Sequence, residues 1–147
     1  GQLMKTITFI SVQAILFLVV SFHICIYYIF LGNQHGDIGI CCQIPKWYEP
    51  LSNLTTDLEA SERAMQFTTG WFIQPILRGE YPQVMKEMLG SRLPNFTREE
   101  SIRLRGSVDF IGLNTVTATY CTYNDNYLSN TGYWQDMNIT TTGNIHI

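Results

Sequence analysis

The sequence is short of charge. Only 21 of its 147 residues are charged, 9 of them Lys or Arg and 12 Asp or Glu, which leaves a net charge of -3. So weak and acidic a balance excludes a polybasic protein that binds nucleic acid through its phosphates. The hydrophobic fraction of 46% excludes a disordered tail. The composition therefore describes a folding chain of at most one domain.

Cysteine and histidine are too few and too scattered for a metal centre. The four cysteines are Cys25, Cys41, Cys42 and Cys121. They form no C-x-x-C pair, and neither His35 nor His146 stands at metal-ligand spacing from them. Cys41 and Cys42 are adjacent, so in a strand their side chains point to opposite faces. We therefore expect no metal and no other cofactor, and we expect both of these thiols to be buried as small hydrophobic groups.

Charge is missing altogether from residues 7–31, a run of 25 residues. As a helix this run is long enough to cross the hydrocarbon core of a membrane, which is about 30 Å thick. Lys5 before it and Tyr27-Tyr28 near its far end suit an anchor whose N-terminus is cytosolic. A cleaved signal peptide fits less well, because no small-x-small site precedes Gly32. A membrane anchor and a stretch of non-native, intron-derived sequence both stay open.

Three N-x-[ST] sequons begin at Asn53, Asn95 and Asn138, all in polar, turn-like surroundings. They are candidate N-glycosylation sites, and they permit a route through the secretory pathway. We therefore expect the protein in the secretory pathway or at a membrane.

The first half of the remaining chain predicts a strand and a long helix. Residues 38–42 form an apolar run before Pro45, which indicates a short strand buried on both faces, and a loop is expected over residues 47–52. Thr56 and Glu59 have the spacing of a capping box. Apolar residues then recur at helical spacing, at Ala60, Ala64, Phe67 and Trp71. We expect a helix from about residue 57 to 74 that ends near Pro75.

Two shorter helices are expected further along. The first is stopped by Gly90, and the second begins at a capping box of Thr97 with Glu100 and is terminated by Gly106. A second strand is expected over residues 108–113. A strand, a long helical crossover and another strand in one sheet imply parallel neighbours with a right-handed connection. Residues 115–147 are interpreted as a long loop with weak strand tendencies.

Seven segments carry a resemblance to a known family. They are Gly36-Asp37-Ile38-Gly39-Ile40, Trp47-Tyr48-Glu49-Pro50-Leu51, Gly70-Trp71-Phe72, Pro75, Gly79-Glu80-Tyr81-Pro82, Arg92-Leu93-Pro94-Asn95-Phe96-Thr97 and Asp109-Phe110-Ile111-Gly112-Leu113-Asn114. In order and spacing they resemble glycoside hydrolase family 1, most closely its plant β-glucosidases. The likeness runs over about residues 34–145. It implies an internal fragment of a (β/α)8 TIM barrel that covers the fifth strand, the helical crossover and the sixth strand. Residues 34–147 would form this partial barrel, and residues 1–33 would stand outside it.

The resemblance also implies retaining hydrolysis of β-glucosides, which needs two carboxyl groups. In the family the acid/base Glu stands in an Asn-Glu-Pro motif and the nucleophile Glu in a Thr-Glu-Asn-Gly motif, and this sequence contains neither. Glu49 matches a separate loop after the fifth strand, while Glu80 and Asp109 are interpreted as structural. We therefore expect no catalytic residue in this chain, and we expect the chain itself to be inactive.

Two residues are candidates for contact with a substrate. Asn114 and position 116 share one face at the end of the second strand, toward the barrel mouth. The family usually has Asn-x-Tyr here, but this chain has Val116, and Thr115 replaces an aromatic residue or His. Asn114 could equally do no more than cap a strand end. Trp47 is a candidate for stacking on a sugar, whereas Trp71 lies on the apolar stripe of the helix and is interpreted as core.

Two hypotheses of function follow. The first is a fragment of a β-glucosidase-type enzyme of carbohydrate metabolism, whose partner is a small-molecule β-glucoside and not a nucleic acid. The second is a membrane-anchored module without catalysis that binds a glycoside or a protein partner, and it uses both residues 7–31 and the sequons.

Overall fold

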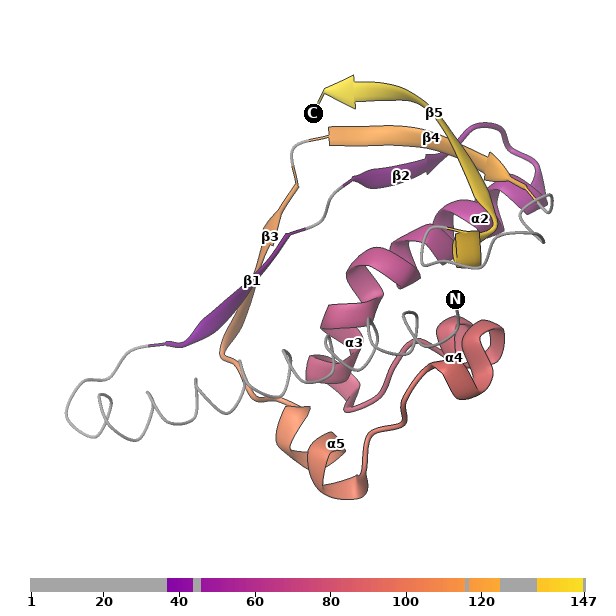
Figure 1. The fold of residues 1–147 in the computed structure, drawn as a ribbon. Helices are drawn as coiled ribbons and strands as arrows, with labels where there is room; N and C mark the ends of the chain where they lie inside the picture. The colour runs from indigo at the N-terminus through magenta and orange to yellow at the C-terminus, as the bar shows by residue number, and fades with distance from the viewer. Residues whose placement is uncertain (1–36, 44–45, 116, 125–134, 147) are drawn as a thin grey trace.

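The computed structural model describes residues 37–43, 46–115, 117–124 and 135–146 (Figure 1). The apolar helix expected over residues 7–31 lies outside these residues, as do Cys25 and Val116. In the part of the chain that the structure describes, no helix is both long enough and apolar enough to cross a membrane.

Two parallel strands joined by a helical crossover confirm the expected β-α-β arrangement. β1 (Gly39–Gln43) pairs with β3 (Phe110–Asn114) in parallel. The interpretation of the first strand as buried on both faces is wrong for these residues, since Cys41 is exposed although Cys42 is buried. Phe110 on the neighbouring strand is 55% exposed, so the described helices leave one face of this pair open.

The crossover begins with one helix that is longer than the sequence predicts. α2 (Thr55–Met65), a π-helical turn η1 (Gln66–Gly70) and α3 (Trp71–Arg78) follow without a break. Pro75 does not end the helix, although it lacks a backbone donor. The helix continues to Arg78, and the carbonyl of Pro75 accepts the N–H of Gly79 at 2.8 Å. Gly79 ends the helix with a left-handed φ of 77°.

The capping box expected at the start of this helix is also wrong. The cap is Leu54, whose side chain makes no capping bond, and Thr56 already lies inside α2. Asp57 is drawn instead into bonds with Ser52 and β4, which fix the start of the helix from outside it.

The shorter helices follow the sequence closely. α4 (Gln83–Leu89) ends at Gly90 and is followed by the 3₁₀ turn η2 (Gly90–Arg92). α5 (Arg98–Leu104) begins at Thr97, and both bonds of its capping box with Glu100 are present. Local signals therefore predicted both of these helices well.

A second sheet occupies regions that the sequence predicted as loops. β2 (Trp47–Pro50), β4 (Thr117–Tyr123) and β5 (Ile139–His146) form a three-stranded sheet in the order β2-β4-β5, and the 3₁₀ turn η4 (Gln135–Met137) precedes β5. β2 is parallel to β4, and β5 is antiparallel to it. The Thr and Tyr residues of β4 favour strand structure, and its pairing with β2 and β5, which lie far from one another in the sequence, completes the sheet.

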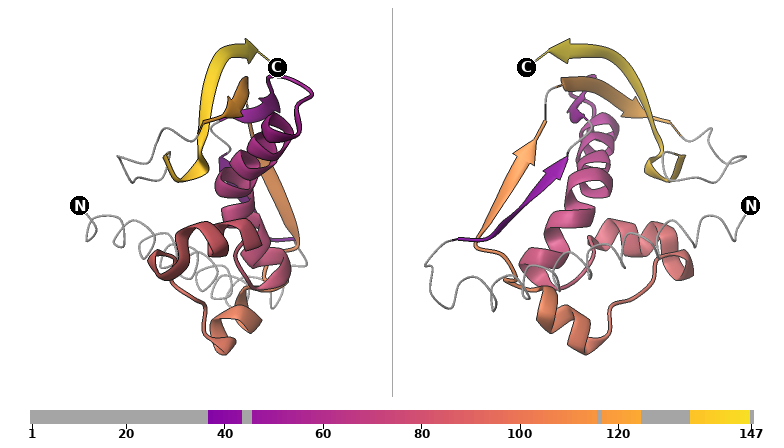
Figure 2. Two further views of the ribbon diagram at one scale, coloured as in Figure 1. Left: turned by 90° about the vertical axis from the view of Figure 1, so that its right-hand side faces the viewer. Right: turned by 60° about the vertical axis from the view of Figure 1, so that its left-hand side comes forward.

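The core lies between this sheet and the helices. In Figure 2 the sheet lies against α2 at one end, while α4 and α5 gather at the far end of α3. The cluster joins Tyr48 and Cys121 from the sheet to Ala60, Ala64 and Phe67 of the helix. The apolar stripe read from the sequence is therefore the face that the helix buries.

Candidate functional site

The two sheets continue one parallel register. Gly39 pairs with Phe110 in the first sheet, and Trp47 pairs with Ala118 in the second, so each step across the pair is 71 residues, from 39 to 110 and from 47 to 118. The pair β2–β4 therefore has the same register as the pair β1–β3. Trp47 therefore pairs with Ala118, which follows Asn114 by four residues in the sequence.

Trp47 and Glu49 form a side-chain pair on the outer face of β2. The indole Nε1 of Trp47 donates a hydrogen bond of 2.8 Å to Oε1 of Glu49. Trp47 is 39% exposed, whereas Tyr48 between them is 3% exposed on the opposite face. The alternation of a strand thus leaves the indole face of Trp47 free for contact while its nitrogen is held.

Tyr48 fixes β2 on the helix. Its carbonyl accepts a hydrogen bond of 3.0 Å from the hydroxyl of Ser61, and its backbone N–H points to the sulfur of Met65 at 3.5 Å. Burial raises the pKa of Tyr48 to about 12. A phenol with this pKa stays protonated at neutral pH. Tyr48 is a core residue, because its side chain is 3% exposed and lies in the core cluster.

Asn114 lies exposed at the carboxyl end of β3, opposite Gln43. Its place at the strand end agrees with the expectation, and Thr115 beside it is half-buried. The role expected of position 116 lies outside the described residues.

Asp57 is a buried carboxylate whose structural role the sequence did not predict. It is buried, and its carboxylate accepts bonds from the hydroxyl of Ser52, the hydroxyl of Thr122 and the backbone N–H of Tyr123. The Ser52 hydroxyl, followed by Thr122, lowers the pKa of this carboxyl below its ordinary value. A signal was present, since Asp57 stands three residues before Ala60 and so continues the apolar stripe. This carboxylate holds the loop after β2 against β4.

Two arginines hold the segment before β5. Arg63 donates to the carbonyl of Met137 at 2.6 Å and to that of Asn138 at 3.2 Å. Arg92 forms two bonds of 2.8 Å with the two carboxylate oxygens of Asp136. Burial lowers the pKa of Arg63, but a guanidinium remains charged at neutral pH.

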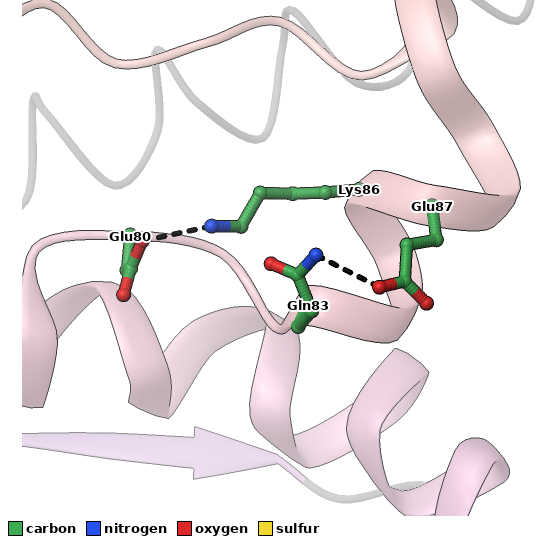
Figure 3. A network of polar contacts seen from close by, with 4 residues as sticks. All are labelled: Glu80, Gln83, Lys86 and Glu87. Atoms are coloured by element: carbon green, nitrogen blue, oxygen red, sulfur yellow. Dashed lines mark hydrogen bonds and ion pairs between the residues drawn. The ribbon is translucent and has the colours of Figure 1, made fainter.

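The other carboxylates singled out from the sequence have structural contacts. Glu80 forms an ion pair of 2.8 Å with Lys86, beside a Gln83–Glu87 hydrogen bond of the same length (Figure 3). Oδ2 of Asp109 accepts the backbone N–H of Ile38 at 2.8 Å and joins the start of β3 to the chain before β1. Both observations agree with the structural roles expected for Glu80 and Asp109.

The remaining candidates from the sequence are core or inert. Trp71 is buried beside Phe72, as expected for a core residue. Burial raises the pKa of the Cys42 thiol, and it raises the pKa of Cys121 to about 11, so neither is a thiolate at neutral pH. No group of three or more metal-ligating side chains is found within the described ranges.

A groove of about 430 Å³ lies elsewhere on the molecule. Its lining includes Glu59, Arg63, Gln66, Gln74, Arg78 and Gln83. These residues come from the helices of the crossover and not from the strand ends where Asn114 and Trp47 lie. The groove is therefore separate from the site that the sequence predicts.

Comparison with known proteins identifies the class to which this fold and these strand ends belong. The sequence model of glycosyl hydrolase family 1 matches residues 15–146, and this chain belongs to that family. The match confirms the resemblance read from the sequence. It begins at residue 15, inside the apolar run, whereas the likeness was expected to begin at about residue 34.

The relatives are mostly plant β-glucosidases. The chain is 46% identical over 89 residues to β-glucosidase 34 of Oryza sativa subsp. japonica, and this alignment covers 60% of the chain and 17% of the relative. It is 44% identical over 115 residues to the raucaffricine-O-β-D-glucosidase of Rauvolfia serpentina, in an alignment that covers 76% of the chain and 21% of the relative. It is 45% identical over 103 residues to the probable inactive β-glucosidase 25 of Arabidopsis thaliana, in an alignment that covers 68% of the chain and 19% of the relative. The chain thus spans about a fifth of the length of these relatives.

Solved structures of this kind share the fold of the described chain. A rice β-glucosidase matches with a TM-score of 0.73 and 36% sequence identity, and the match covers 80% of this chain and 25% of the rice chain. A β-glucosidase of Trichoderma harzianum matches with a TM-score of 0.81 and 30% identity, covering 93% and 29%. The fold is therefore a fragment of a (β/α)8 barrel.

Proposed function

We propose that this chain is an internal segment of a β-glucosidase-type barrel in which β1 and β3 take the places of the fifth and sixth strands, and that the segment alone does not hydrolyse β-glucosides. The observation that carries the first part is the parallel β1–β3 pair with its helical crossover, set beside family relatives of which the chain spans about a fifth. A segment of this size contributes strand ends to a site that other parts of a barrel complete.

The chemistry of the described carboxylates supports the second part. Retaining hydrolysis needs a nucleophile and, about 5 to 5.5 Å away, a carboxylic acid whose pKa is raised so that it can donate a proton. The pKa of Asp57 is lowered by Ser52 and Thr122, and that of Glu80 is lowered by Lys86. Both shifts run against proton donation, and Glu49 is engaged by the indole of Trp47.

In a completed barrel, the residues of this chain would bind and orient the substrate. The exposed ring of Trp47, fixed by Glu49, offers an apolar face on which a sugar ring can stack. The amide of Asn114 at the end of β3 offers both a donor and an acceptor for a sugar hydroxyl. Val116 has no hydroxyl with which to orient a nucleophile carboxylate, which favours weaker catalysis in a barrel built with this segment.

An assay of the full 147-residue chain on a chromogenic β-glucoside tests the absence of activity. We expect no turnover above buffer for either the chain or its Glu49→Gln variant, with the rice β-glucosidase as positive control. Turnover that disappears in Glu49→Gln would overturn the proposal, because Glu49 would then be a catalytic carboxylate.

A segment exchange tests the place of the chain in a barrel. Residues 34–145 replace the aligned segment of the rice β-glucosidase, in one version as they stand and in another with Val116→Tyr. We expect both hybrids to fold, with higher kcat for the Tyr version. Hybrids that lose the circular dichroism of the parent would contradict the assignment of β1 and β3.

A second candidate is a module that binds a glycoside without hydrolysing it. It is favoured by one observation, that two relatives, from Arabidopsis thaliana and Oryza sativa, are named probable inactive β-glucosidases. Titration of the chain's tryptophan fluorescence with a β-glucoside, beside a Trp47→Phe variant, separates the two candidates. Saturable quenching by the β-glucoside favours binding, and calorimetric titration of Trp47→Phe, which does not depend on the removed fluorophore, shows whether Trp47 contributes to it.

The three sequons fit a protein that passes through the secretory pathway, and we extend the proposal to that localisation. Fractionation of cells that express the tagged full chain tests it, since a chain found only in the cytosolic fraction contradicts it.

A further inference from the structure

The three sequons differ sharply in the folded chain. Transfer of a glycan to Asn requires that the acceptor amide, the following side chain and the hydroxyl two residues later all be reachable by the transferring enzyme. These three parts can be inspected at each sequon, because all of them lie within the described residues.

The sequon at Asn138 is closed. Asn138 has a left-handed φ of 50°, and its carbonyl accepts bonds from Arg63 and from the backbone of Asn124. Ile139 is buried in the core cluster. The hydroxyl of Thr140 already accepts a hydrogen bond of 2.6 Å from the side-chain amide of Asn124. Both the backbone and the hydroxyl of this sequon are therefore in use.

The sequon at Asn95 is partly closed. Asn95 is exposed, but the ring of Phe96 stacks on Tyr81 with 4.4 Å between ring centroids. The hydroxyl of Thr97 accepts the N–H of Glu100 in the capping box of α5. Using this sequon in the folded chain would break the cap and the stacked pair.

The sequon at Asn53 has all three side chains exposed. Only its backbone is engaged, since the N–H of Leu54 donates to Oγ of Ser52 at 3.3 Å and the Leu54 carbonyl accepts the N–H groups of Asp57 and Leu58, each at 3.0 Å. Asn53 and Thr55 are exposed, and Leu54 between them is 65% exposed in an extended conformation. Leu51 and Leu58 on either side of the sequon are also exposed, each by about half. A glycan at this place would cover an apolar surface without displacing a packed side chain.

We propose that Asn53 is the N-glycosylation site of the folded chain, while the fold protects Asn95 and Asn138. The donor is an oligosaccharide linked through a diphosphate to a lipid. A bond forms between Nδ2 of Asn53 and the anomeric carbon of the first sugar, the bond from that carbon to the diphosphate oxygen breaks, and the amide gives up one proton as the lipid diphosphate leaves.

The test uses the purified full chain, a purified single-subunit oligosaccharyltransferase and its lipid-linked donor. Three synthetic peptides that span the sequons serve as unfolded controls, and glycopeptide mapping reports the occupancy of each site. We expect all three peptides to accept the glycan. In the folded chain we expect Asn53 to be modified at least about tenfold faster than the other two sites, because they must first open locally.

Variants complete the test. Asn53→Gln leaves the core untouched and removes the modification of the folded chain, whereas Asn95→Gln, also at an exposed position, leaves it unchanged. Glycosylated chain should also bind less of an apolar dye than unmodified chain, since the leucines around Asn53 are covered. Equal labelling of Asn138 and Asn53 in the folded chain, or an unmodified Asn53 beside a peptide that accepts, overturns the proposal.

Discussion

Asp57 in the first turn of α2 is hydrogen bonded to Thr122 in β4, with 2.6 Å between the carboxylate Oδ1 and the hydroxyl. The same oxygen accepts the backbone N–H of Tyr123 at 3.1 Å, and Oδ2 accepts the hydroxyl of Ser52 at 2.6 Å. One carboxylate therefore joins the loop after β2, the start of the helix and β4, which lies 65 residues further along the chain. Trp47 and Glu49 themselves are placed by the direct pairing of β2 with β4, and the Asp57 bridge reinforces that pairing from the helix side.

Replacing Asp57 with Asn should destabilise the fold at pH 7. The amide keeps one acceptor oxygen, but its nitrogen must face a hydroxyl or an N–H that needs an acceptor. We expect the midpoint of thermal unfolding to fall by more than about 5 °C, measured by circular dichroism. An unchanged midpoint would mean that the three bonds contribute little.

Asp57 should also make the free energy of unfolding fall at low pH. The pKa of Asp57 is lowered in the folded chain, chiefly by the Ser52 hydroxyl. Its charge therefore stabilises the fold fully above the ordinary Asp value of about 3.9, and this contribution is lost as the pH falls through the lower pKa of the folded chain. Between pH 7 and pH 3 the wild-type chain should lose more stability than Asp57→Asn. Equal losses in urea unfolding would contradict this.

The two capping boxes read from the sequence provide a matched pair of variants. Thr97→Ala removes a cap that the structure contains and should cost about 1 kcal/mol of unfolding free energy. Thr56→Ala changes a residue that lies exposed inside α2 and should be close to neutral, because Ala is the better helix former. Urea unfolding of both variants checks the difference, and equal costs would show that the cap at Thr97 contributes nothing.

The ion pair of Arg92 with Asp136 should couple strongly. Arg92 is 21% exposed and Asp136 9% exposed in their side chains, and the contact is bidentate. Breaking it with Arg92→Gln or Asp136→Asn should cost about 2 kcal/mol, and the double variant should cost less than the two together. The exposed pair Lys86–Glu80 is the control, for which a double-mutant cycle should find no measurable coupling.

Gly79 should tolerate Ala less well than Gly106. Both have a positive φ, 77° and 68°. An added Cβ at Gly79 would stand 2.5 Å from the hydroxyl oxygen of Ser101 and 2.6 Å from its carbonyl oxygen, whereas at Gly106 it would meet open space. We expect about 1 kcal/mol for Gly106→Ala from backbone strain alone, and at least twice that for Gly79→Ala. Unfolding free energies of the two variants settle the comparison.

The sequence determined the elements whose signals are local. The apolar stripe from Ala60 to Trp71, the stop at Gly90 and the cap at Thr97 could be predicted, because each depends on residues within a few turns of one another. The parallel pairing of β1 with β3 joins residues 71 apart, and it followed from the order of strand, helical crossover and strand. The segments shared with the family could likewise be recognised in the sequence, since they are runs of neighbouring residues. The structural role of Asp109 at the start of β3 followed from them.

The tertiary structure alone decided the second sheet and the contacts that hold it. β2 is four residues long, and β5 contains Thr residues that favour strands but no alternation of apolar and polar residues that would indicate one. Both are strands through their pairing with β4. The same holds for the bonds of Asp57 to Thr122 and of Arg63 to Met137, which join residues more than 60 apart. A hydrogen bond between distant residues produces no periodic pattern in the sequence. Only the tertiary structure therefore shows which polar side chains are buried and what they bond to.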